Sequence, residues 1–184
     1  GDAFITGFDR EGMFHETSQG GMWPRIYEEG VGLLNNLLAI PVPVIAAVNG
    51  SALIHAELPV VSDIVLAADT AEFADLAHFP NGTVPGDGVH TVWPMLLGPN
   101  RGRYFLLTGE RIGAAEAQRL GVVAEVLPAE QLLPRARELA EGMALHSAAA
   151  LRYTRALLVR ELRRRMFDEL PSGLAHEALA TLVR

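Results

Sequence analysis

The segment PVIAAVNG, residues 43–50, carries the strongest fold signal in this sequence. Its central run, residues 44–48, is continuously apolar and ends at an Asn-Gly turn, a pattern typical of a strand buried on both faces. The segment IVLAA at residues 64–68 has the same character, and residues 71–74 predict a third short strand. Strands of this kind belong to parallel sheets, so these segments indicate an α/β fold.

Helical periodicity surrounds these strands. Apolar residues at helical spacing predict a helix over residues 24–38. Further short elements are expected as strands at residues 3–6 and 122–127 and as helices at residues 89–97, 101–107 and 114–119. From residue 129 the pattern is helical, with interruptions at Ser147 and Pro171. We therefore predict an α/β core over residues 1–128, followed by a helical region over residues 129–184.

The composition excludes several classes of protein. The chain has 184 residues, no cysteine, and 15 Lys+Arg against 22 Asp+Glu, for a formal net charge of −7. Without cysteine there are no disulfides, cysteine zinc sites or thiol nucleophiles. The acidic balance argues against a nucleic-acid partner, and no apolar stretch reaches the ~20 residues of a membrane helix. We expect a cytoplasmic enzyme or subunit that handles a small molecule.

The loop between His78 and Asp87 is the densest group of residues that could perform chemistry. Two prolines stiffen it, and it can fold back to bring the Asp carboxylate to the imidazole. The carboxylate would then fix the tautomer of His78, leaving its other ring nitrogen free to take a proton from water. Two alternatives remain open. Asp87 could cap a helix that begins at Gly88 while His78 merely packs, or His78, Asp87 and His90 could bind a metal, although no strong ligand spacing supports that.

A second candidate region is the turn after Asn49-Gly50, which runs through Ile54, His55 and Glu57. Backbone N–H groups at a junction between a strand and a helix suit an oxyanion or an enolate. An ordinary turn, with a packed histidine, explains the same residues.

Several motifs, in order, resemble those of the crotonase (enoyl-CoA hydratase/isomerase) superfamily. GDAFITGFD at residues 1–9 is similar to a G-x-A-F-x-x-G-x-D segment, and residues 43–50 are similar to P-x-I-A-A-x-x-G. TVPG at residues 83–86, LTGERI at residues 107–112 and residues 114–128 match later landmarks. The resemblance covers essentially the whole chain.

This resemblance implies a spiral ββα core with a C-terminal helical region that forms trimers, so a homotrimer or a dimer of trimers is expected. It also implies an oxyanion hole of two backbone N–H groups, near Phe8 and near Ile54 or His55. Members commonly have about 260 residues, and this sequence begins within a strand and without an initiator Met. We therefore expect that an upstream piece, with the first strands and helix of the core, is missing.

The sequence departs from the acyl-CoA members of the superfamily. Those members carry a glycine-rich turn where this chain has Ile54, His55 and Ala56, and close approach of backbone to a thioester favours glycine. Only Glu57 matches a hydratase glutamate, because the second should fall near Ala77 or His78.

HFP at residues 78–80, VPGDGVH at residues 84–90 and GPNRGRYFLLTG at residues 98–109 resemble instead the β-diketone hydrolases of the superfamily, of the 6-oxocamphor hydrolase type, which use no CoA. By that resemblance the His–Asp pair is His78 and Asp87, a late pocket glutamate is Glu177, and His55 is a pocket residue. The predicted function is hydrolytic cleavage of a C–C bond in a cyclic β-diketone, without cofactor or metal. An enoyl-CoA hydratase or isomerase that uses Glu57 is the alternative, and a non-catalytic subunit of the same fold is a third.

Overall fold

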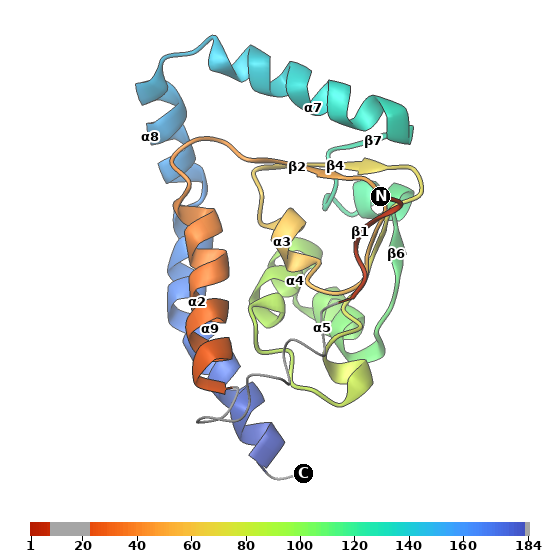
Figure 1. Cartoon of the computed structure of the whole chain (residues 1–184), viewed down its shortest axis with the longest axis vertical. Helices are drawn as coiled ribbons and strands as arrows, with labels where there is room; N and C mark the ends of the chain where they lie inside the picture. The colour runs from red at the N-terminus through yellow and green to blue at the C-terminus, as the bar shows by residue number, and fades with distance from the viewer. Residues whose placement is uncertain (8–22, 183–184) are drawn as a thin grey trace.

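The computed structural model describes residues 1–7 and 23–182, and two small sheets form its centre (Figure 1). The first has the strand order β1 (Ala3–Ile5), β3 (Ser51–Ala52), β5 (Glu72–Phe73) and β6 (Ile112–Gly113). The second has the order β2 (Ile45–Val48), β4 (Ile64–Ala68) and β7 (Glu125–Leu127). The described neighbours pair in parallel, apart from β5 and β6, so the predicted parallel α/β fold is confirmed.

The helices cover these sheets and form one long side of the molecule. They are α2 (Trp23–Ala39), α3 (Glu57–Val60), α4 (Val89–Leu97), α5 (Pro99–Thr108), α6 (Ala114–Arg119), α7 (Ala129–Ala144), α8 (Ala148–Leu158) and α9 (Arg160–Leu182), with a 3-10 turn η1 (Phe79–Asn81). In Figure 1, α7 crosses above β2 and β4, while α2 and α9 run side by side. Among the described residues, no helix is both long and apolar enough to cross a membrane.

The expected elements are present, with two corrections. Strand β2 is not buried on both faces, since Ile45, Ala46 and Ala47 are only half-buried. The reason is its position at the edge of the second sheet, where β4 is its one partner among the described residues. Pro171 does not break the last helix, because α9 continues through it. Leu170 and Leu174, both buried on either side of the proline, hold this part of the helix against the core.

The main core lies between the first sheet and the pair α2 and α9. Its largest buried side chains include Phe73, Trp93 and Phe105, and the rings of the last two lie 4.3 Å apart. Packing of α9 on α2 is close, because a Cβ on Gly30 would lie 3.0 Å from Leu174. A smaller cluster under α7 joins Leu66, Ala68, Leu132 and Ala136.

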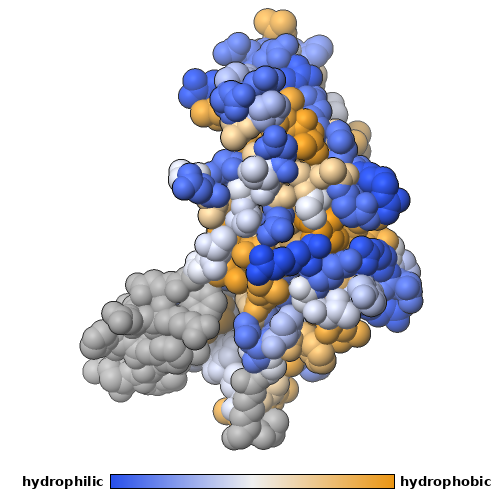
Figure 2. Space-filling model, turned by 90° about the vertical axis from the view of Figure 1, so that its right-hand side faces the viewer, coloured by the Kyte–Doolittle hydropathy of each residue, from blue (hydrophilic) through white to orange (hydrophobic). Residues whose placement is uncertain are grey.

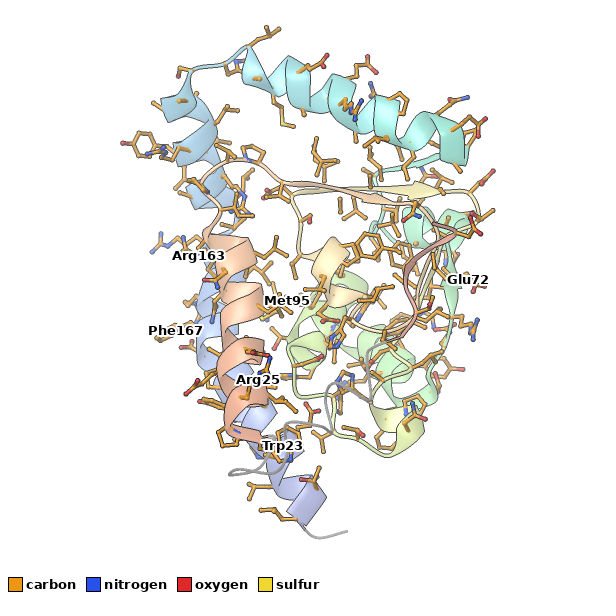
Figure 3. All side chains as sticks on the ribbon, viewed as in Figure 1. Trp23, Arg25, Glu72, Met95, Arg163 and Phe167 are labelled. Carbon is orange, nitrogen blue, oxygen red and sulfur yellow. The ribbon has the colours of Figure 1, made fainter. Side chains whose placement is uncertain are left out.

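The outer surface carries charged and apolar side chains intermixed, as the face on the β6 side shows (Figure 2). Arg163 and Phe167 lie on the outer side of α9, and Glu72 marks the opposite side of the molecule (Figure 3). Arg164 and Arg165 each bond to Glu161 at 2.9 Å, so part of this arginine-rich run is paired within its own helix.

A buried arginine joins the helical region to the core. Arg155 on α8 is only 2% exposed, and it donates to Asp63 at 2.6 Å. It also donates to the carbonyl groups of Leu38 and Ile40 at the end of α2, where a cation complements the helix dipole. Asp63 in turn accepts the backbone N–H of Val44 at 2.7 Å, just before β2.

Replacing this arginine should therefore loosen the contact between α8 and α2. We expect Arg155→Met to lower the free energy of unfolding by ~3–5 kcal/mol, because Asp63 and several carbonyl groups lose their donor. Chemical denaturation measures the change. The matched control is Arg152→Met, on the exposed side of the same helix, which should stay within ~0.5 kcal/mol of the parent protein. Equal losses of unfolding free energy in the two variants would contradict the role of Arg155 as the buried link between α8 and α2.

Candidate active site

Six ionisable side chains from four parts of the chain meet beside the first sheet. His55 and Glu57 come from the start of α3, and Asp75 and His78 from the segment after β5. Asp87 precedes α4, and Glu177 lies on α9. The structure thus brings together all the described side chains that the sequence proposed for catalysis, and it adds Asp75.

The backbone holds Asp75 and His78 firmly. Ala74 N–H donates to Ala52 O at 3.0 Å and Leu76 N–H to Leu53 O at 2.9 Å, which continues the pairing of β3 with β5 past the strand ends. The carbonyl of His78 accepts from the N–H groups of the two residues at positions 81 and 83, at 2.8 and 3.1 Å. The two side chains therefore project from well-ordered backbone.

His78 lies between two carboxylates. Its Nδ1 is 2.6 Å from Asp75 Oδ1, and its Nε2 is 3.3 Å from Asp87 Oδ2. Burial lowers the pKa of His78, but hydrogen bonds and charge from Asp75 and Asp87 outweigh burial and raise the pKa to about 11. The ring is accordingly an imidazolium at neutral pH, with a carboxylate facing each nitrogen.

His55 makes a second imidazole bridge. Its Nδ1 lies 3.1 Å from Asp87 Oδ2 and 3.0 Å from Glu57 Oε1, and these two carboxylates raise its pKa to about 10. The residue has φ of 49°, a conformation that side chains other than glycine seldom adopt and that is often found at functional sites. Its side chain is 34% exposed, so it remains accessible from one side.

The carboxyl groups differ sharply in their acidity. Burial raises the pKa of Glu57 to about 7, with the charge of Asp87 adding to the effect. Burial also raises the pKa of Asp87, but the rings of His55 and His78 outweigh it and hold this pKa well below its usual range. Glu177, raised to about 7 mainly by burial, keeps a buried Oε2 without a hydrogen-bond partner among the described residues. The site therefore contains one carboxylate that is ionised at neutral pH and two carboxyl groups that titrate near neutrality.

A contact between two glycines brings α9 to the loop that carries Asp87. A Cβ on Gly86 would lie 2.2 Å from Gly173 O and 3.1 Å from Glu177 Cβ. A Cβ on Gly173 would lie 2.2 Å from Gly86 O and 2.5 Å from the ring of His90. Only glycine at both positions allows this approach, which sets Glu177 beside the loop.

The structure decides between some of the alternatives left by the sequence. Asp87 does not cap α4, because Gly88 is the residue before the helix and no side-chain cap bonds there. His78 does not merely pack, since it has two carboxylate partners. Ile54 is buried at the turn, whereas Phe8 lies outside the described residues.

The suggested metal set is also corrected. Among the described residues, the group whose ligand atoms lie within 4.8 Å of one another is His55, Glu57 and Asp87, rather than His78, Asp87 and His90. These three side chains could hold a cation, but the proton on His55 would have to leave first.

Asp75 was not among the residues predicted from the sequence. Its signal was present, because an aspartate that directly follows a buried strand and precedes a histidine by three residues can turn back to that histidine. The proline-stiffened loop instead predicted the carboxylate farther along the chain, Asp87, as the partner of His78.

These features define an acid–base site on a parallel α/β frame. Comparison with known proteins gives the family: a profile described as enoyl-CoA hydratase/isomerase matches residues 1–177. The chain belongs to this family, the crotonase superfamily, and has its α/β fold with C-terminal helices.

Individual relatives fall into two groups. A β-diketone hydrolase from the cyanobacterium Anabaena sp. PCC 7120, solved with (S)-3-oxocyclohexyl acetic acid, is 44% identical with a TM-score of 0.93, over 98% of this chain and 72% of that one. An enoyl-CoA hydratase/isomerase structure from Mycobacterium paratuberculosis is 28% identical with a TM-score of 0.84, over the same shares.

A probable enoyl-CoA hydratase of Mycobacterium leprae is 37% identical over 143 residues, which are 77% of this chain and 53% of the relative. The chain therefore spans about half the length of the curated relatives it matches.

The glycine contact predicts an effect of a single methyl group. Gly173→Ala should destabilise the protein by ~1–3 kcal/mol, although alanine is the better helix former, because its Cβ must push α9 away from Gly86. Gly142→Ala on α7 is the matched control, with nothing within 4 Å of the new Cβ, and should stabilise by ~0.5–1 kcal/mol. Thermal and chemical unfolding measure both, and a stabilising Gly173→Ala would show that the close contact is absent.

Proposed function

We propose that this protein hydrolyses a C–C bond of a cyclic β-diketone, a retro-Claisen cleavage that gives a keto acid. The observation that carries the proposal is the cluster in which His78 and Asp87 face each other across 3.3 Å while Glu177 leaves an oxygen unbonded beside them. The similarity to a β-diketone hydrolase at 44% identity supports the same reaction class.

In this proposal, the pair His78 and Asp87 activates the attacking water. Their contact is electrostatic rather than a well-aligned hydrogen bond, because neither Asp87 oxygen has a regular bond to a described residue. Because both nitrogens of the charged His78 ring already carry protons, the pair can take a proton from an attacking water only at the Asp87 carboxylate, while the water oxygen bonds to one carbonyl carbon. Strongly interacting groups titrate together, so the proton belongs to the pair rather than to one residue.

The tetrahedral intermediate then breaks its bond to the carbon between the two carbonyl groups. The electron pair of that bond becomes the enolate of the second ketone, and the first carbonyl carbon becomes a carboxyl group. His55, charged and accessible from one side, can donate to the enolate oxygen. Protonated Glu177 gives its proton to the enolate carbon, and the water-derived proton on the pair later restores it.

The turn after β3 favours a diketone over a thioester. Where acyl-CoA relatives use glycine, His55 takes the positive φ itself and fills the space with an imidazole. Four carboxyl groups also surround two imidazoles, and a neutral diketone meets less repulsion there than an anionic ligand.

A second candidate function is hydration of an enoyl-CoA. It is favoured by Glu57, which is 1% exposed and has a pKa raised to about 7. Glu57 and Asp87 both contact Nδ1 of His55. Two carboxyl groups of different acidity could act as acid and base. Turnover of crotonyl-CoA, with no turnover of any diketone, would favour this function.

Exposed apolar side chains on α8 support assembly of several copies, and we include a homotrimer in the proposal. Tyr153, Leu157 and Leu158 are all exposed on this helix. Beneath it lies a cavity of about 390 Å³, lined in part by Pro43 and Met143. Burial of such a surface between copies would remove it from water.

The proposed reaction predicts a specific product. Incubation with a bicyclic β-diketone, whose cleavage would give a 3-oxocyclohexyl acetic acid, should yield a product heavier by one water. In ¹⁸O-labelled water the label should enter the carboxyl group, because water attacks the carbonyl carbon. Mass spectrometry measures both.

The same assay tests the water-activating pair. His78→Ala should lower kcat by ~10²–10⁴-fold, since the pair loses its ring. His146→Ala, an exposed histidine between α7 and α8, is the matched control and should retain normal turnover. A His78→Ala protein with near-normal turnover would refute this mechanism.

The acidity of Glu177 predicts the pH profile. Its pKa of about 7 means that the carboxyl group keeps its proton below that pH and loses it above. Because the protonated form supplies the enolate carbon, kcat/KM should fall as the pH rises through about 7. Glu177→Gln should lower kcat and remove this limb. If the limb persists in Glu177→Gln and disappears in Glu57→Gln, Glu57 is the proton donor instead.

A further inference from the structure

We propose that Asp75 is the positioning residue for His78, and that it holds a proton on Nδ1 so that Nε2 is the nitrogen that meets water and Asp87. This inference rests on the proposed hydrolase function and adds to it a residue with a distinct role. The carrying observation is the 2.6 Å contact between Asp75 Oδ1 and His78 Nδ1 inside the protein.

The two carboxylates on His78 differ in how they are placed. The Asp75 side chain is 1% exposed, while that of Asp87 is 14% exposed. Asp75 makes a regular, short hydrogen bond to the ring, whereas Asp87 contacts the other nitrogen at 3.3 Å without good alignment. Both Asp87 oxygens are themselves buried, so the two carboxylates differ in alignment: the aligned one of Asp75 suits orientation of the ring, and the loosely held one of Asp87 suits proton transfer.

The backbone keeps Asp75 in this position. Hydrogen bonds from its two neighbours, Ala74 and Leu76, to the segment after β3 fix the chain on both sides of it. Asn81 further ties the carbonyl of Leu76 through its side-chain amide. With the main chain held on both sides of Asp75, its Oδ1 sets one orientation of the ring and keeps a proton on Nδ1, as the outer partners of histidines commonly do.

A neutral residue at position 75 should undo this selection without changing shape. Asp75→Asn keeps the size of the side chain but removes its charge, and its NH₂ group can turn toward Nδ1. The ring proton is then no longer required on Nδ1. As a result, Nε2 is no longer fixed as the nitrogen that faces water and Asp87. The other ionisable groups that face this region are unchanged: Asp87 before α4, His55 and Glu57 at α3, and Glu177 on α9.

The test compares Asp75→Asn with Asp69→Asn, an exposed aspartate after β4. We expect Asp75→Asn to lower kcat for the diketone by about 10²-fold or more, with KM changed less than about threefold. In ¹⁵N-histidine spectra, with His78 assigned from His78→Ala, Nδ1 should carry a proton in the parent protein and should no longer hold it fully in Asp75→Asn. Asp69→Asn should match the parent in both measurements.

Two results would overturn the proposal. One is a kcat per folded molecule within about threefold of the parent for Asp75→Asn, whatever the spectra or the melting temperature show. The other is a parent spectrum in which His78 carries no proton on Nδ1, which needs no variant and so holds even if Asp75→Asn fails to fold. If the parent protein cleaves no diketone, the proposed function fails, and the spectra still decide how Asp75 and His78 interact.

Discussion

Gly86 on the loop before α4 and Gly173 on α9 touch through their backbones, and the assembly of the site depends on that contact. Residues nearly ninety positions apart in the chain meet there because neither has a Cβ. The contact carries Glu177 to the loop that holds Asp87, and Gly30 lets Leu174 pack α9 on α2 beside it. Without this approach the last helix would still be amphipathic, but its glutamate would have no reason to be buried and its pKa would not rise.

Burial and charge act together on the groups that meet there. His78 and His55 would lose their protons easily in an apolar pocket, yet carboxylates hold both rings charged. Those two positive rings in turn keep Asp87 ionised although it is deeply buried. Glu57 and Glu177 gain less from the rings, so burial dominates and they titrate near neutrality. One cluster therefore provides an anion held between two charged rings and two carboxyl groups that titrate near neutrality, the groups on which the proposed water addition and enolate protonation depend.

Much of this arrangement could be predicted from the sequence. The apolar runs at residues 44–48 and 64–68 predicted the parallel strands. The stiff loop predicted that His78 and Asp87 lie together. Periodicity could not show that β2 lies at a sheet edge, because strand order is a tertiary property. It could not show that α9 passes through Pro171, because packing of Leu170 and Leu174 compensates for the lost hydrogen bond. Asp75 was not predicted, because its spacing of three residues from His78 allows the contact but does not show in which direction the side chain points.

At the turn after β3, His55 adopts φ of 49° and places an imidazole beside Asp87 and Glu57. Once His55 is present, it needs a counter-ion, and Asp87 and Glu57 supply it. Asp87 is then shared between two rings, and both its oxygens stay buried without a regular hydrogen bond to a described residue. The backbone conformation of the turn is thus coupled, through charge, to the carboxylate that faces His78.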